Sequence, residues 1–122
     1  MCPKHFMFCA PWPPSVNRAW RSIGEGRVLL SAEGRAYTRR LVNALPVGRI
    51  EPLTGRLTVI YALSAPLDLQ KKRWDIANRE KVLSDACTRA RVWLDDSQID
   101  DLRIVRGDYS DPGHVDVYII SR

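Results

Sequence analysis

A chain of 122 residues, 45% of them hydrophobic, is typical of one globular domain, and we expect residues 1–122 to form a single domain. No apolar run approaches the roughly 20 residues that span a bilayer, and the first ten residues hold prolines and charges unlike a signal peptide. The net charge of +5 favours a polyanionic partner, although a solvated basic surface without a partner is the alternative.

Cysteine and histidine usage argues against several kinds of site. The three cysteines, Cys2, Cys9 and Cys87, are an odd number without metal-like spacing, which predicts reduced thiols in a cytoplasmic protein. His5 and His114 are isolated in the sequence, and we interpret both as structural. No Ser/His/Asp, Cys/His or glycine-rich phosphate-binding motif is present.

The first part of the chain predicts strands joined by a basic loop. Residues 5–10 alternate as a short strand, which the prolines at 11, 13 and 14 end because proline lacks a backbone donor. Residues 17–21 form a polar, basic loop. The turn signal at 24–26 precedes a strand at 27–30 that would close a hairpin.

Two helices and three strands are predicted beyond this point. Ser31 caps a helix that ends near Leu45, and β-branched and aromatic residues make 56–64 the clearest strand. A second helix runs from Asp75 or Ile76 to about Arg91, and strands at 102–106 and 115–120 follow. The core face of this helix carries Val82, Leu83, Ala86, Cys87 and Ala90.

The resulting order, β-β-α-β-α-β-β, predicts an α+β fold with two main helices on a mixed β-sheet. Arg79 falls towards the apolar side of the second helix. We expect it to snorkel at the helix end, or this end to be less buried than the pattern suggests.

Cations gather before the second helix. Lys71, Lys72 and Arg73 at a loop tip are typical of phosphate contacts, with a merely solvated loop as the alternative. Trp74 follows them and could stack on a base, wedge into a distorted junction or anchor the core. Asn78 and Lys81 share a helix face with Asp85, where Lys81 could hold a phosphate or be a solvated lysine.

Carboxylates stand on both sides of this helix, with Asp75 before it and Asp95 and Asp96 after it. Mg²⁺ prefers oxygen ligands and can activate water for phosphodiester cleavage. A helix of about 16 residues is roughly 24 Å long, so the Asp pair must be brought back by the following strand or by a partner chain. The alternative is that Asp75 caps the helix and the pair are turn residues. Asp100 and Asp101 are interpreted as solvated or paired with Arg103.

Over nearly its whole length the chain resembles the RusA-type Holliday junction resolvases, small endonucleases often carried by phages and prophages. The resemblance rests on four segments that follow one another in order. These are Pro11-Trp12-Pro13-Pro14-Ser15 with Asn17-Arg18, Ser31-Ala32-Glu33-Gly34 with Ala36-Tyr37, the basic run into Asp75 with Asn78 and Lys81, and Trp93-Leu94-Asp95-Asp96-Ser97-Gln98-Ile99.

This resemblance implies a homodimer that binds four-way DNA junctions and makes two symmetric, Mg²⁺-dependent cuts in DNA recombination and repair, with Mn²⁺ as a substitute ion. A dimer suits a two-fold symmetric junction, which needs two cuts. The resemblance implies catalytic roles for Asp75, Lys81 and Asp96. It implies metal binding by Asp75, Asp95 and Asp96, with Asp95 weighted below Asp96. DNA contacts are implied for Asn17, Arg18, Lys71, Lys72, Arg73, Trp74 and Asn78.

The chain departs from the family pattern at two positions. Ala77 replaces the second aspartate of the D-x-D-N motif, and a methyl group cannot ligate a metal or orient water. Such a change is compatible with a natural variant and with a deliberate inactivating substitution. We therefore predict that the chain binds junctions and cuts them poorly or not at all. Trp74 is the second departure, at a position that tends to be basic in the family.

Two alternative functions remain open at this point. One is a protein that binds branched DNA without cutting it. The other is a small α+β protein whose basic surface contacts RNA or another acidic partner. A resolvase should bind four-way DNA in preference to duplex and RNA competitors, whereas the small α+β protein with a basic surface should show no such preference.

Overall fold

A computed structural model of the chain describes residues 4–24, 27–47 and 51–122. Its main sheet has four strands in the order β1-β6-β4-β5, with β6 antiparallel to β1 and β4 and with β5 parallel to β4. The strands are β1 (Lys4–Pro11), β4 (Leu57–Ser64), β5 (Ile99–Arg106) and β6 (His114–Ser121). The predicted α+β fold with a mixed sheet is thereby confirmed.

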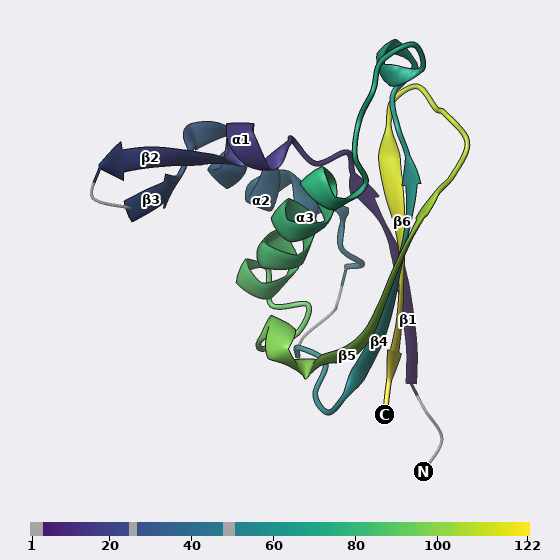
Figure 1. Ribbon diagram of the computed structural model, residues 1–122. Coiled ribbons are helices and arrows are strands. Elements are labelled where there is room, and N and C mark those ends of the chain that lie inside the picture. Colours follow the sequence, from purple (N-terminus) through teal and green to yellow (C-terminus); the bar gives the residue numbers. More distant parts are fainter. Residues whose placement is uncertain (1–3, 25–26, 48–50) are drawn as a thin grey trace.

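Both predicted main helices are present as α2 (Ala32–Ala44) and α3 (Ala77–Arg89), and they cover one face of the sheet (Figure 1). Ser31 caps α2 as predicted, since its side chain accepts a hydrogen bond from the Gly34 amide. The α3 helix starts at Ala77, and its N-cap position, Ile76, provides no side-chain cap. Asp75 is therefore not the N-cap of α3. None of the described helices has the length and apolarity that crossing a bilayer requires.

The core lies between the helices and the inward face of the sheet. Every second residue of β4 is buried, because side chains alternate between the two faces of a strand. The predicted core face of α3 is confirmed: Val82, Leu83, Ala86 and Cys87 are buried, and Ala90 is partly buried. No helix among the described residues covers the opposite sheet face, which exposes Met7, Val105 and Tyr118.

The structure differs from the prediction at 17–21, where a loop was expected. A short helix, α1 (Val16–Ala19), is followed by β2 (Trp20–Gly24), which pairs with β3 (Arg27–Leu30) in a separate two-stranded sheet. Ala19 is fully buried, and α1 packs against α2. Of the predicted turn at 24–26, residues 25 and 26 lie outside the described residues.

The β5 strand begins at Ile99, three residues earlier than predicted. Asp100 and Asp101 therefore lie within the strand, and both carboxylates form ion pairs there. Asp100 pairs with Arg56 at 2.5 Å and with Arg122 at 3.3 Å. Asp101 pairs with Arg103 at 3.1 Å, as one of the two interpretations proposed. Short 3₁₀ helices, η1 (Leu67–Leu69) and η2 (Asp96–Gln98), precede the basic loop and β5.

Gly34 lets α2 approach α1 and the end of β3 closely. A Cβ at this position would lie 2.6 Å from the Ala19 carbonyl oxygen and 2.6 Å from Leu30 Cδ1. We expect Gly34→Ala to lower the free energy of unfolding by about 1–3 kcal/mol through overpacking, despite a gain in helix propensity of about 1 kcal/mol. Urea denaturation measures this difference. Asn43→Ala, at an exposed position of the same helix, is the control and should not destabilise; a Gly34→Ala protein as stable as this control would contradict the close packing.

Candidate functional site

A hollow of about 440 Å³ brings together two segments that the sequence places far apart. Pro13 and Pro14 of the N-terminal motif form one side, and Lys72 of the basic loop forms another. Its cationic lining consists of Arg18, Arg40, Lys72 and Arg79, and we call this feature the basic hollow. Glu33 and Asp68 also line it, so cations outnumber carboxylates by four to two. Such a lining suits an anionic group such as a phosphate.

Arg79 is half-buried, and it joins α3 to the N-terminal motif. Its Nη1 donates a hydrogen bond of 2.8 Å to the Pro13 carbonyl oxygen, and its guanidinium lies 5.3 Å from the Trp12 ring centroid. Burial, and secondarily the charge of Arg18, lowers the pKa of Arg79. The Nε atom is buried without a partner among the described residues. The side chain thus leaves the apolar face of α3 by reaching a backbone carbonyl.

Trp74 is held in place by Trp12 and Arg106. Its ring meets that of Trp12 edge to face at a centroid distance of 5.5 Å, and the Arg106 guanidinium lies 3.9 Å from its centroid. Arg106 Nη2 also donates to the Trp74 carbonyl oxygen at 2.6 Å. These contacts favour the anchoring interpretation of Trp74, and contact with DNA stays a prediction.

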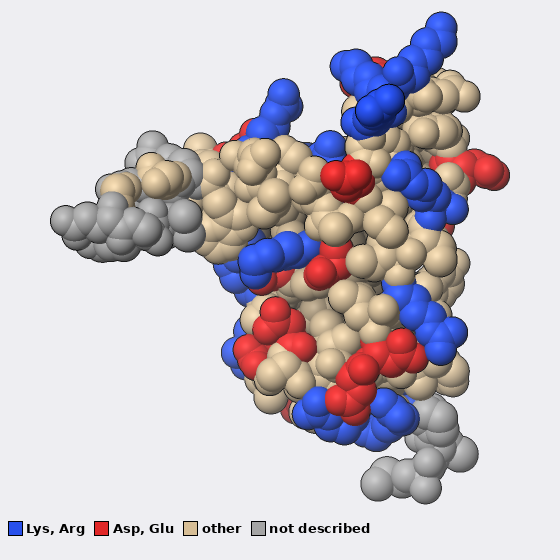
Figure 2. Space-filling model, in the orientation of Figure 1, with Lys and Arg blue, Asp and Glu red and all other residues tan. Residues whose placement is uncertain are grey.

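The other predicted DNA-contacting side chains lie on the surface. Lys71, Lys72 and Arg73 are exposed just beyond η1, and Figure 2 shows basic side chains gathered at this tip of the molecule. Asn17 and Arg18 are exposed on α1, and Asn78 is exposed in the first turn of α3. Of this set, the structure brings Arg18 and Lys72 to one cavity.

Asp75 and Asp96 lie near opposite ends of the β4–β5 pair. Asp75 follows Trp74, which is bonded to Arg106 at the end of β5. Asp96 lies three residues before Ile99, which starts β5 opposite Leu57 at the start of β4. Since β5 starts beside the Asp pair and leads away from it, the following strand does not bring the pair back to Asp75. That expectation is wrong, and assembly through a partner chain stays a prediction.

Asp95 and Asp96 differ in whether their carboxylates have hydrogen-bond partners. The Asp95 carboxylate accepts hydrogen bonds from the Ser97 amide and hydroxyl and caps η2, and these bonds lower the pKa of Asp95. Asp95 is therefore a turn residue, as the alternative proposed. Within the described part of the chain, the carboxylates of Asp96 and Asp75 have no hydrogen-bond or ion-pair partner, which leaves both available to a ligand.

Lys81 faces the Asp pair rather than Asp75. It lines a second hollow with Asp85, Asp95 and Asp96, and its Nζ lies 3.5 Å from Asp85 Oδ2. We call this feature the Lys81 hollow. It places Lys81 beside Asp85 and the carboxylates of the second acidic motif, whereas Asp75 of the first motif does not line it. Figure 2 shows acidic and basic side chains intermixed on this lower part of the molecule.

The predicted metal ligands do not form a cluster within one chain. Among the described residues, the only group of three ligand atoms within 4.8 Å of one another belongs to Cys9, His114 and Asp116. Asp75, Asp95 and Asp96 form no such group, and Ala77, the first residue of α3, provides no ligand. His114 is isolated in the sequence but not in the fold, because pairing of β1 with β6 brings residues from both ends of the chain together.

Comparison with known proteins agrees with the arrangement of motifs. Residues 11–120 match the family described as Endodeoxyribonuclease RusA. The chain is 37% identical to crossover junction endodeoxyribonuclease RusA of Shigella sonnei over 114 residues, or 89% of this chain and 88% of that protein. With the same coverage, it is 36% identical to the Escherichia coli K12 protein of that name and 34% identical to that of Enterobacteria phage 82. The chain therefore belongs to the RusA family of endodeoxyribonucleases.

Proposed function

We propose that this protein is a cytoplasmic, structure-selective endonuclease for four-way DNA junctions, and that it binds junctions but cuts them poorly. Membership of a family whose relatives are named crossover junction endodeoxyribonucleases supports the substrate class. The observation that carries the proposal is the basic hollow, in which the N-terminal motif and the basic loop meet. Three of the four family-like segments thus line one hollow, since Glu33 and Tyr37 of the second segment also contribute to it.

The basic hollow suits a DNA backbone more than a single small anion. Its cations come from α1, α2, α3 and the loop after η1, so the charge is spread over several elements. The exposed Lys71 and Arg73 extend this charge beyond the hollow along the same loop. Distributed cations of this kind bind phosphates with little dependence on base sequence, which agrees with recognition of DNA by its branched form.

We expect poor cleavage because the carboxylates of the predicted metal site are too few and too far apart within one chain. Mg²⁺ is usually held by one or two carboxylates together with substrate phosphate. At the start of α3 only Asp75 remains, because Ala77 carries a methyl group there, while Asp96 lies near the other end of the β4–β5 pair. The residues present do not form a complete Mg²⁺ or Mn²⁺ site within one chain, and we derive no cleavage step through such an ion.

A homodimer would present two such surfaces to the two halves of a junction. The sheet face that no helix covers carries a row in which Met7 pairs with Tyr118 and Tyr118 pairs with Ile60. Met7 is 63% exposed and Tyr118 is 40% exposed, so the row presents an apolar surface to solvent. This face is formed by β1, β6 and β4, and we assign the dimer contact to it.

Lys72→Ala tests the basic hollow. We expect it to weaken binding to a synthetic four-way junction several-fold and to lower the salt slope of log K by about 1, because one phosphate contact is lost. Fluorescence anisotropy over a salt series measures both quantities. Lys4→Ala, which removes an exposed lysine at the far end of β1, is the matched control. Equal losses in the two variants would mean that net charge, not this hollow, accounts for binding.

Ala77→Asp tests whether position 77 limits cleavage. A second carboxylate beside Asp75 would hold an ion against a DNA phosphate, and aspartate in the first turn of a helix is also favourable for stability. We expect Mg²⁺-dependent paired nicking of a four-way junction to rise at least about tenfold, as expected for restoring part of a metal site. Gel analysis with linear duplex as control measures it, and Ala77→Asn supplies the same shape without charge. Tight junction binding without any gain in cutting would instead favour a non-cleaving branched-DNA-binding protein.

Met7→Glu tests the proposed dimer face. A charge in the middle of this apolar row should shift the protein from dimer to monomer, because burying an unpaired carboxylate is unfavourable. Light scattering coupled to size-exclusion chromatography measures the mass. Val47→Glu, at a fully exposed valine beyond α2, is the matched control and should remain dimeric. A monomeric unmutated protein would contradict the homodimer, and a dimeric Met7→Glu variant would place the interface elsewhere.

A further inference from the structure

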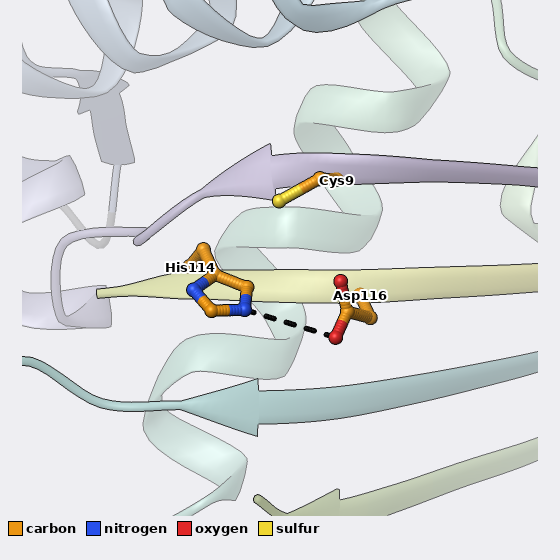
Figure 3. A group of neighbouring side chains, drawn as sticks. All are labelled: Cys9, His114 and Asp116. Atoms are coloured by element: carbon orange, nitrogen blue, oxygen red, sulfur yellow. Dashed lines mark ion pairs between the residues drawn. The ribbon is translucent and has the colours of Figure 1, made fainter. Parts of the chain in front are cut away.

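Cys9, His114 and Asp116 are brought together by the pairing of the first strand with the last. In the β1–β6 register Cys9 stands opposite Asp116, and Pro11 stands opposite His114. Residues two apart on a strand point to the same face, so His114 and Asp116 are neighbours on the face that also carries Cys9. Figure 3 shows the thiol, the imidazole and the carboxylate gathered over these two strands, with a helix behind them.

The separation of His114 from Asp116 suits a shared ion better than a direct hydrogen bond between these two side chains. The three ligand atoms lie within 4.8 Å of one another, and His114 Nε2 lies 3.7 Å from Asp116 Oδ2. That separation exceeds the roughly 2.7–3.2 Å of an N–H···O hydrogen bond. Two nitrogen or oxygen ligands at about 2.0–2.1 Å from a tetrahedral ion lie about 3.4 Å apart, so a small adjustment of side chains would place all three on one ion.

We propose that Cys9, His114 and Asp116 bind a zinc ion, with a fourth position open to water or to an added ligand. One sulfur, one nitrogen and one oxygen donor form a set that Zn²⁺ accepts at four-coordinate sites, whereas Mg²⁺ takes oxygen ligands. This site uses none of the residues assigned to DNA cleavage. It lies at the end of β1 from which the chain enters the N-terminal proline motif.

Within a single chain the site is accessible, at the end of the sheet face that also carries Met7 and Tyr118, and the thiol must lose a proton to bind. Cys9 is exposed, and a hollow lined by Cys9, Pro112 and His114 adjoins it. Partial burial, then the charge of Asp116 and a hydrogen bond to it, raises the pKa of the Cys9 thiol in the metal-free protein. A thiolate is the form that ligates Zn²⁺, so binding releases this proton and replaces a thiol–carboxylate contact with two metal bonds.

The chain offers matched controls for the two most diagnostic ligands. It has only one other histidine, His5, which is exposed on β1 opposite Ile120. Cys2 precedes the described residues and can be removed without touching the three ligands. Cys9→Ala and His114→Gln are therefore compared with Cys2→Ala and His5→Gln, all as the full chain without DNA.

Titration with Zn²⁺, and separately with Co²⁺, measures affinity, stoichiometry and the thiolate-to-cobalt absorption band. The unmutated protein and both controls should bind one ion per chain and show the band. Cys9→Ala should abolish the band, and Cys9→Ala, His114→Gln and Asp116→Asn should each weaken binding at least about tenfold. Absence of binding by the unmutated protein, or equal losses in His5→Gln and His114→Gln, would overturn the proposal. Since no DNA is present, the outcome is independent of junction cleavage.

Discussion

Parallel pairing of β4 with β5 is the constraint on which the arrangement of the functional groups depends. Two parallel neighbours need a crossover, and α3 provides it by returning across the sheet from the end of β4 to the start of β5. The crossover packs Val82, Leu83, Ala86 and Cys87 onto the inward face of the sheet, which stabilises both. It also separates the two acidic motifs, because one precedes α3 and the other follows it.

A cluster of aromatic and arginine side chains connects this crossover to the start of the chain. Arg79 on α3 bonds the Pro13 carbonyl, while Trp12 packs against Trp74 just before α3. Proline-rich backbone has few donors of its own but retains its carbonyls, and a half-buried guanidinium satisfies one of them. The N-terminal motif is therefore held beside the basic loop, and the basic hollow is a result of core packing rather than of surface charge alone.

Charge is distributed in a way that agrees with binding more than with catalysis. Basic side chains gather at the tip beyond η1, whereas the acidic residues around η2 lie among cations that pair with several of them (Figure 2). Ala77 places no negative charge at the start of α3, where a carboxylate would repel a DNA phosphate. These features support the proposal that the chain binds junctions and cuts them poorly.

The sequence by itself determined the elements whose residue pattern is local: both main helices, the Ser31 cap, the buried face of α3 and the mixed α+β class. It also carried the ordered motifs that place the chain in its family, because motif spacing is a property of the chain alone. The short α1 and β2 were missed, since a single buried Ala19 and the pairing with β3 decide them.

Only the tertiary structure decided which distant residues meet. Arg18 and Lys72 share a hollow, Lys81 faces Asp96 rather than Asp75, and Cys9 meets His114 across paired strands. Sequence spacing describes ligands on one element, whereas strand register joins residues from opposite ends of a chain. Hydrophobic burial on one sheet face sets that register, and the polar residues on the other face are brought together as its consequence.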